Sequence, residues 1–281
     1  MRHDGRVKVH LIDGTYELFR QFFGRPGHLN GKGEEVGAAR AVLRGMLSML
    51  EDGATHVGVA TDHVVESFRN ELYDGYKTGE GMEPTILSQF LPFEDGLRAL
   101  GLATFAMVEF EADDALASAA AVAAADERVE HVLICTPDKD LAQCVRQGRV
   151  LQFDRRKDKV FDVDDVIEKF GVRPESIPDW LALVGDSADG FPGLPGWGAK
   201  SAASVLFRYD HIEQIPLAAG QWDISVRGGA KLAKTLADQL DDALLFRTLA
   251  TLALDAPSIT SVDDLEWTGP TADLPSIAAR F

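Results

Sequence analysis

The chain has 281 residues, of which 46% are hydrophobic and 26% are charged. These proportions are ordinary for a globular protein, and the length suffices for one large domain or two small ones. The formal net charge is -17 at pH 7. This sign excludes a protein that coats nucleic acid through bulk electrostatic attraction, so any contact with nucleic acid must be local or bridged by metal ions.

Cysteine usage and the N-terminal sequence bear on the cellular compartment. Cys135 and Cys144 are the two cysteines of the chain, too few for a disulfide framework or a cysteine zinc site. The first ten residues lack the apolar core of a signal peptide, and no apolar run is long enough to cross a bilayer. We therefore expect a cytoplasmic protein that does not contact a membrane.

Three short apolar runs each end close to an acidic residue. Residues 7–12, 57–60 and 132–135 are predicted strands, and Asp13, Asp62 and Asp138 come after them. Helical patterns at 38–50 and 112–125 separate the runs, and this alternation predicts an α/β fold with a mainly parallel central sheet flanked by helices. Ligands bind such sheets at the carboxyl ends of the strands, where these acids are expected to lie.

Residues 76–93 break this alternation with two glycines and two prolines. Such punctuation predicts a mobile lid rather than a core element. From about Asp162 onward, short helical segments interrupted by prolines replace the strand patterns. We therefore predict an α/β core over residues 1–162 and a helical subdomain over residues 163–281.

Further acids come in clusters along the chain. The sequence E-A-D-D places three acids around the start of the helix at 112, more than helix capping requires, although a cap is the alternative interpretation. So many acids in one cleft would repel each other unless divalent cations lay between them, and Mg²⁺ prefers such oxygen ligands. The predicted metal ligands are nine carboxylates: Asp13, Asp62, Glu111, Asp113, Asp114, Asp138, Asp140, Asp186 and Asp189.

The segment G-L-P-G-W-G-A-K-S at 193–201 misses the P-loop pattern by one residue, because Ala199 stands before Lys200. We predict instead a tight hairpin between two helices, in which Gly196 and Gly198 bring backbone N–H groups against a phosphate. Five basic and three acidic residues between positions 197 and 234 support a contact with the DNA backbone. A solvated basic helix pair is the alternative.

The segment F-R-N-E-L-Y-D-G-Y-K lies beside the predicted lid. Lys77 at the edge of an acidic cleft offers a phosphate clamp, and Tyr76 offers a platform for base stacking. Arg69 is a further candidate for a DNA contact. A purely structural role in the core is an equally good interpretation of the aromatic residues here.

Five motifs in this order, L-I-D-G, F-R-x-x-L-Y-x-x-Y-K, E-A-D-D, T-P-D-K-D and G-D-S-A-D-G-F-P-G-L-P-G-W-G-A-K-S-A, resemble the bacterial and phage 5′ nucleases. This family includes the N-terminal 5′-3′ exonuclease domain of DNA polymerase I and is related to the flap endonucleases. The resemblance implies a PIN-like core, a helical arch around 76–93 and a helix-three-turn-helix module at about 186–202.

The resemblance also implies the cofactors and the roles of single residues. It implies two Mg²⁺ ions held by the nine acids, with Mn²⁺ as a possible substitute, and K⁺ at the hairpin. Its implied catalytic residues are Asp13, Asp113, Asp138, Lys77 and the phosphate-contacting Arg20. The implied binding residues are Gly193, Gly196 and Gly198 in the potassium and DNA-backbone hairpin, and Tyr76, Arg69, Lys200 and Ser201 on the DNA.

One position departs from the family pattern. Members usually carry arginine three residues beyond the arch lysine, whereas this chain has Glu80. An acid at this place is expected to change how the arch holds the scissile phosphate. The chain also ends at Phe281, so we expect no polymerase domain to follow.

These observations predict a stand-alone, monomeric 5′-3′ exonuclease or structure-specific 5′ flap endonuclease. It would act on DNA with 5′ ends, flaps or nicks by a two-metal mechanism, with one group of acids around Asp13, Asp62 and residues 111–114, and a second group from Asp138 onward. One alternative is a noncatalytic, structure-specific DNA-binding protein on the same fold. A metal-dependent ribonuclease ranks last, because the predicted hairpin suits a duplex DNA backbone better.

Overall fold

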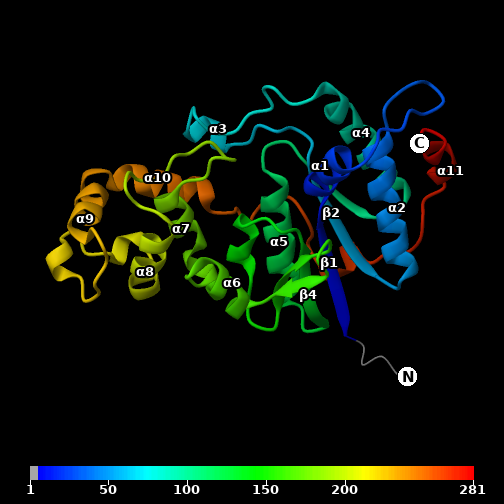
Figure 1. The fold of residues 1–281 in the computed structure, drawn as a ribbon. Helices are drawn as coiled ribbons and strands as arrows, with labels where there is room; N and C mark the ends of the chain where they lie inside the picture. Colours follow the sequence, from blue (N-terminus) through cyan, green and yellow to red (C-terminus); the bar gives the residue numbers. More distant parts are fainter. Residues whose placement is uncertain (1–5) are drawn as a thin grey trace.

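The computed structural model describes residues 6–281, so the first five residues of the predicted core lie outside the described part. Its centre is one six-stranded sheet with the strand order β3-β2-β1-β4-β5-β6 (Figure 1). The first five strands in this order are parallel, and β6 runs antiparallel to β5. The predicted mainly parallel sheet is therefore confirmed. The strands are β1 (Val7–Asp13), β2 (His56–Asp62), β3 (Ala103–Met107), β4 (Val129–Cys135), β5 (Val150–Asp154) and β6 (Lys159–Phe161).

The register of the sheet aligns the ends of its central strands. In β1, Asp13 pairs with Ala60 of β2, and Ile12 pairs with Cys135 of β4. The first six residues of β2 are all buried, as expected for a parallel strand covered on both faces. The acids that follow these strands thus begin from one edge of the sheet.

Helices cover both faces of the sheet. Helix α5 (Ala112–Ala125) packs on one face against Val9 and Leu11, whereas α2 (Gly37–Glu51) and α4 (Pro84–Ala99) pack on the other. Helix α1 (Gly14–Gly24) leaves β1 directly.

Only glycine permits the turn from β1 into α1. A Cβ atom at Gly14 would lie 2.7 Å from the carbonyl oxygen of Ala60 in the neighbouring strand. Helix α1 can therefore start close against the sheet, immediately after Asp13.

The predicted mobile lid at 76–93 is wrong for its second half. Pro84 opens α4, and Ile86, Phe90 and Phe93 of this helix are buried in the core. Proline at the first turn of a helix starts the helix rather than interrupting it, which the sequence interpretation overlooked. The irregular, mostly exposed stretch is limited to residues 77–83, which connect α3 (Arg69–Leu72) with α4 (Figure 1).

A separate group of helices follows β6, as the sequence predicted. Their core includes Leu181, Val205, Leu206 and Leu236, all fully buried. No helix within residues 6–281 has the length and apolar character needed to cross a membrane. The helices of this group are α6 (Val163–Phe170), α7 (Ile177–Val184), α8 (Ala199–Tyr209), α9 (Gly229–Asp238) and α10 (Leu240–Ala250), with the 3₁₀ helices η2 (Pro174–Ser176), η3 (Ile212–Gln214) and η4 (Ala219–Gln221). Two further 3₁₀ helices lie outside this group: η1 (Asp140–Cys144) between β4 and β5, and η5 (Val262–Leu265) after α10.

The C-terminal segment departs from the predicted helical subdomain over 163–281. After α10 the chain returns to the α/β core, where Ile259, Val262 and Leu265 pack with the α5 face of the sheet. On the other face, the indole N–H of Trp267 donates to the carbonyl of Leu100 at 2.8 Å, and α11 (Leu274–Ala278) contacts α4. Irregular chain carries no helical or strand period, so the sequence alone did not reveal this return.

This docking can be tested with two leucines of the same segment. Leu265 is buried and Leu254 is 63% exposed. We expect Leu265→Ala to lower the free energy of unfolding by about 2–4 kcal/mol, because it leaves a cavity under the sheet. Leu254→Ala should change it by less than about 0.5 kcal/mol. Urea unfolding followed by circular dichroism measures both, and equal effects would contradict the docking of this segment.

Candidate active site

Carboxylates gather at the carboxyl edge of the central strands. Two groups of three bring one oxygen from each side chain within 4.8 Å of one another. The first cluster is Asp113, Asp138 and Asp140, and the second cluster is Asp140, Asp186 and Asp189. Asp140 belongs to both, so the clusters adjoin. Asp138, which was predicted to act with the later acids, lies with Asp113 as well as with Asp140.

Asp13 and Asp62 lie beside the first cluster and are held by hydrogen bonds. Asp13 accepts from the backbone N–H of Tyr16 at 2.8 Å and from the hydroxyl of Thr136 at 2.9 Å. Asp62 accepts from the N–H of Ala112 at 2.8 Å, at the start of α5. These bonds restrain both carboxylates.

Three acids of this site, Asp13, Asp113 and Asp140, have raised pKa values. Burial, only partly offset by its hydrogen bonds and reinforced by the charges of Asp62 and Asp138, raises the pKa of Asp13 to about 7. Burial and neighbouring carboxylates also raise the pKa of Asp113 and of Asp140 well above the ordinary value. The cleft therefore carries more negative charge than it can hold ionised without added cations.

The donor set fits divalent cations. Asp140 belongs to both clusters, and its buried Oδ1 accepts no hydrogen bond within the described residues. A buried carboxylate oxygen without a partner is costly. Oxygen-only clusters of this kind suit Mg²⁺ or Mn²⁺.

Two lysines lie among these acids. Lys77 Nζ is 2.8 Å from Glu111 Oε2 and 3.0 Å from Asp189 Oδ1, so the predicted site lysine does reach the cleft. Lys139 Nζ is 2.5 Å from Asp186 Oδ2, and Lys139 is not among the predicted site residues. Its signal was present in D-K-D, where a lysine between two acids follows directly after a strand.

Glu111 stays ionised in spite of its burial. Burial favours its protonated form, but the charges of Lys77 and Arg69 outweigh this effect and hold the pKa of Glu111 below its ordinary value. The hydroxyl of Ser67 also donates to Glu111 at 2.7 Å. Glu111 thus anchors Lys77 at the cleft.

The predictions for Asp114 and Arg69 are wrong. Asp114 is fully buried and takes two hydrogen bonds of 2.7 Å from the guanidinium of Arg69, and its Oδ1 also accepts from the N–H of Ala253 at 2.8 Å. Arg69 is itself buried and donates to the carbonyl oxygens of Leu249 and Thr251. Neither side chain is free for a metal ion or for DNA. The helix position of Asp114 turns it inward, which the spacing of acids alone did not show.

Tyr76 and Arg20 were both predicted to contact DNA, and the structure places them in different surroundings. Tyr76 is 3% exposed and packs in the core of the helical group, so the prediction of a base-stacking platform is wrong. Arg20 lies on α1 and pairs with Glu17. Its buried Nε has no hydrogen-bond acceptor within residues 6–281.

The predicted hairpin is the connection between α7 and α8. Gly193 and Gly196 have positive φ angles of 69° and 87°, which favour glycine. Gly198, at φ -146°, has extended backbone and does not need glycine. Its N–H donates to the hydroxyl of Ser201 at 3.0 Å, and Lys200 is exposed.

The same connection carries acids of the second cluster. The backbone N–H of Lys77 donates to the carbonyl of Asp189 at 3.0 Å. At Gly190, a Cβ atom would lie 2.1 Å from the carbonyl oxygen of Gly75. The loop therefore docks tightly against the chain segment that bears Lys77.

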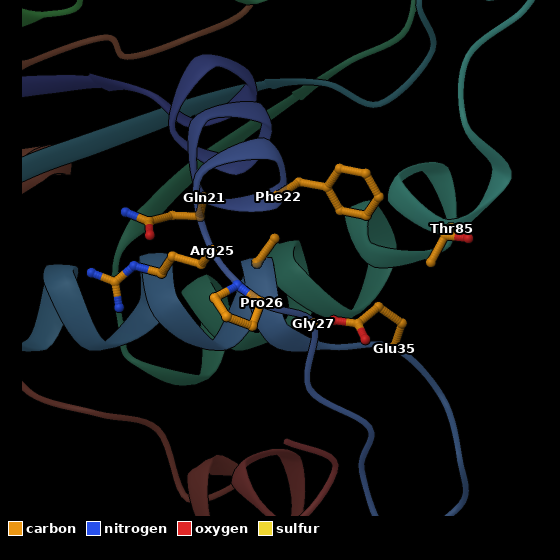
Figure 2. A pocket seen from close by; sticks show the side chains of 8 residues that line it. Gln21, Phe22, Arg25, Pro26, Gly27, Glu35 and Thr85 are labelled. Carbon is orange, nitrogen blue, oxygen red and sulfur yellow. The ribbon is translucent and has the colours of Figure 1, made fainter.

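A surface pocket of about 230 Å³ lies elsewhere, at the end of α1, the following loop and the first turn of α4 (Figure 2). Phe22, Arg25, Glu35 and Thr85 are among its lining side chains. None of the nine predicted metal ligands is among the described residues that line it. The carboxylate clusters and this pocket are separate features.

The sheet and its carboxylate clusters define an acidic α/β protein whose oxygen ligands suit divalent cations. Residues 8–171 match the family described as 5′-3′ exonuclease, N-terminal resolvase-like domain. Residues 172–273 match 5′-3′ exonuclease, C-terminal SAM fold. The chain belongs to the 5′-3′ exonuclease family.

Relatives and solved structures agree with this family. The chain is 34% identical to DNA polymerase I of Bacillus subtilis (strain 168) over 269 residues, which cover 94% of the chain and 30% of that relative. It therefore spans only about 30% of the length of this relative. It is also 34% identical to a 5′-3′ exonuclease of Aquifex aeolicus (strain VF5), over 74% of the chain and 71% of the relative.

Two solved structures share the fold at low sequence identity. The 5′-exonuclease of phage T5 with bound zinc is 19% identical, with a TM-score of 0.70 over 96% of this chain and 99% of that one. The T5 D15 flap endonuclease in a complex with DNA and metal ions is 21% identical, with a TM-score of 0.67 over 96% and 99%. The predicted fold class is confirmed.

The structural role of Asp114 can be tested against its neighbour Asp113. We expect Asp114→Asn to lower the free energy of unfolding by about 3–5 kcal/mol, because it breaks a buried ion pair and leaves Arg69 without full compensation. Asp113→Asn should leave stability unchanged or raise it in the presence of a chelator, since it removes a repelled charge. Urea unfolding measures both; a large loss for Asp113→Asn and none for Asp114→Asn would contradict the assignment.

The raised pKa of Asp13 predicts how stability depends on pH without metal. The carboxyl of Asp13 has an ordinary pKa of 3.8, which applies to the unfolded chain, so the folded protein binds this proton more tightly. The free energy of unfolding therefore falls as the pH rises from about 4 to about 7. We expect the Tm of chelator-treated protein to fall more steeply between pH 5 and 8 than that of Asp13→Asn. Excess Mg²⁺ should reduce the fall by binding the ionised folded state. Parallel pH profiles for both proteins in chelator would contradict this.

Proposed function

We propose that this chain is a metal-dependent nuclease that hydrolyses DNA phosphodiesters, as a 5′-3′ exonuclease and as a structure-specific 5′ flap endonuclease. The observation that carries the proposal is the pair of carboxylate clusters that share Asp140 at the carboxyl edge of the sheet. Membership of the 5′-3′ exonuclease family supports it, as does the relative from Aquifex aeolicus named for this activity.

Two Mg²⁺ ions, with Mn²⁺ as a substitute, are the proposed cofactors. Asp113 and Asp138 would hold one ion, Asp186 and Asp189 the other, and Asp140 would contribute to both. Bound ions of this kind activate water and stabilise the leaving oxygen. The zinc bound to T5 5′-exonuclease supports a divalent ion in this fold.

Other residues near the two clusters would orient water and metal ligands or neutralise the charge of the scissile phosphate. Asp13 and Asp62, fixed by their hydrogen bonds, would position water and ligands around the first cluster. Lys77, whose ammonium lies between two carboxylates, would steer and neutralise the scissile phosphate. Arg20, which lies on α1, is proposed as a second phosphate contact.

The lid residue Glu80 would modify this contact. It is exposed in the irregular stretch between α3 and α4, where an acid repels an approaching phosphate. We propose that Glu80 lowers the rate or narrows the range of accepted DNA ends.

The connection between α7 and α8 is proposed to bind the DNA backbone. Gly193, Gly196 and Gly198 would present carbonyl and N–H groups to K⁺ and to a phosphate, and the exposed Lys200 would add a positive charge. Ser201 would contribute through its hydroxyl, which here caps α8. The flap endonuclease of T5 in complex with DNA supports this kind of partner.

The organisation of the chain is also a proposal. We place the junction between core and helical group near residue 162, with the C-terminal segment belonging to the core. The monomeric state and the cytoplasmic location stay predictions.

The proposal is tested with a 5′-flap duplex labelled at either end. We expect Mg²⁺-dependent cleavage near the junction that a chelator abolishes, and a loss of more than about 100-fold in Asp138→Ala, because loss of a direct ligand costs more than the ~10–100-fold of a supporting residue. DNA binding in Ca²⁺ should stay close to wild type. Asp52→Ala, an exposed acid at the end of α2, is the matched control.

The outcomes separate the two candidate functions. Cleavage by Asp138→Ala at the wild-type rate would contradict the metal assignment. Binding of the flap without cleavage under Mg²⁺ and Mn²⁺ would favour the noncatalytic DNA-binding protein, with Glu80→Arg as the variant to examine next.

A further inference from the structure

Lys139 lies within the second cluster and is not explained by the proposed mechanism. Its Nζ is 2.5 Å from Asp186 Oδ2 and 3.7 Å from Asp140 Oδ1. Both of these oxygens are buried and accept no hydrogen bond within the described part of the chain. The ammonium therefore supplies the positive charge at the place where these two carboxylates meet.

The two clusters both consist of carboxylates, but they differ in how many of these carboxylates pair with a lysine. Each acid of the second cluster has a lysine within 4.0 Å, because Lys139 faces Asp140 and Asp186, and Lys77 faces Asp189. In the first cluster, Asp113 and Asp138 form no ion pair with a lysine or arginine of residues 6–281. A divalent cation thus meets an ammonium group at every acid of the second cluster, but in the first cluster only at Asp140, which the two clusters share.

Lys139 is able to leave. Its side chain is 33% exposed, and a lysine carries a compact charge on a flexible four-carbon stem. Like charges repel at short range, so a divalent cation and the ammonium cannot both remain against Asp186 Oδ2 without a large penalty. Binding of a cation there requires the ammonium to move toward solvent.

Asp186 does not depend on Lys139 for its position. Its backbone N–H donates to the carbonyl of Phe191 at 2.8 Å, and its carbonyl accepts from Phe191 N–H at 3.0 Å. Its Oδ1 accepts from the N–H of Ala188 at 3.0 Å. The loop would keep its shape after removal of the lysine, so the ion pair has an electrostatic rather than an architectural role.

We propose that Lys139 is a built-in competing cation that lowers the affinity of the second cluster for a divalent ion. The first cluster then fills at lower metal concentration, and the second fills after the Lys139 ammonium has left Asp186. The inference rests on the proposed function, because it takes the two clusters as the metal sites. It adds a residue that sets the order of filling.

The test is calorimetric titration of DNA-free protein with Mn²⁺ at fixed pH and ionic strength. We expect two classes of site in the wild type, of which Asp189→Asn removes the weaker and Asp113→Asn the tighter. In Lys139→Met the weaker class should bind about tenfold more tightly, because one competing charge is gone. The tighter class should stay within about twofold, since its ion-pair partners are largely unchanged.

Two control variants separate the local effect from a change in net charge. Lys139→Arg retains the positive charge and should keep the weaker class weak. Lys159→Met removes a lysine that is 52% exposed and paired with Asp165 at 3.1 Å, and it should leave both classes as in the wild type. Lys139→Gln serves as a second charge-removing variant, and circular dichroism confirms the fold of each protein.

The possible failures are distinguishable. Two classes of site whose weaker affinity is unchanged or reduced in Lys139→Met and Lys139→Gln would overturn this inference alone. If these variants lose affinity for DNA while their Mn²⁺ binding is unaltered, the inference is also overturned, and Lys139 is a DNA-binding residue. Unfolding of both variants would make Lys139 architectural and also overturn it. Absence of Mn²⁺ binding in the wild type would overturn the metal assignment of the proposed function itself.

Discussion

Mutual repulsion among buried carboxylates is the constraint on which the rest of this structure depends. The register of the parallel strands brings Asp13 and Asp62 to one edge, and the segments after β4 and α7 add the acids of both clusters. Three features reduce this repulsion. The pKa of Asp13 is raised, hydrogen bonds are donated to the carboxylates, and the ammonium groups of Lys77 and Lys139 lie among them. A bound divalent cation would neutralise more charge than any of these.

The three acids of the motif E-A-D-D have different roles because each lies in different surroundings. In E-A-D-D, Glu111 pairs with Lys77, Asp113 belongs to the first cluster, and Asp114 pairs with the buried Arg69. Arg69 in turn bonds the carbonyls of Leu249 and Thr251, where the chain leaves α10. The start of α5 thus serves both the cleft and the junction through which the C-terminal segment returns to the core.

The helical group and the cleft share one segment of chain. The connection between α7 and α8 contains the glycines of the proposed DNA-backbone site and also contributes Asp186 and Asp189 to the second cluster. Its carbonyl at Asp189 accepts from the N–H of Lys77, so a hydrogen bond joins this connection to the segment that bears Lys77. This proximity gives a physical route by which a bound DNA backbone would bear on the metal site.

The sequence by itself determined the mainly parallel sheet, the edge of the sheet at which the acids gather, and most of these acids. These features follow from local patterns, because apolar runs form strands and the residues after parallel strands lie at one edge. Tertiary structure alone decided which polar residues remain available. It buries Asp114, Arg69 and Tyr76, places Lys139 against Asp186, packs α4 into the core and returns the C-terminal segment to the sheet. Each of these outcomes depends on contacts between residues distant in the chain, which no local pattern encodes.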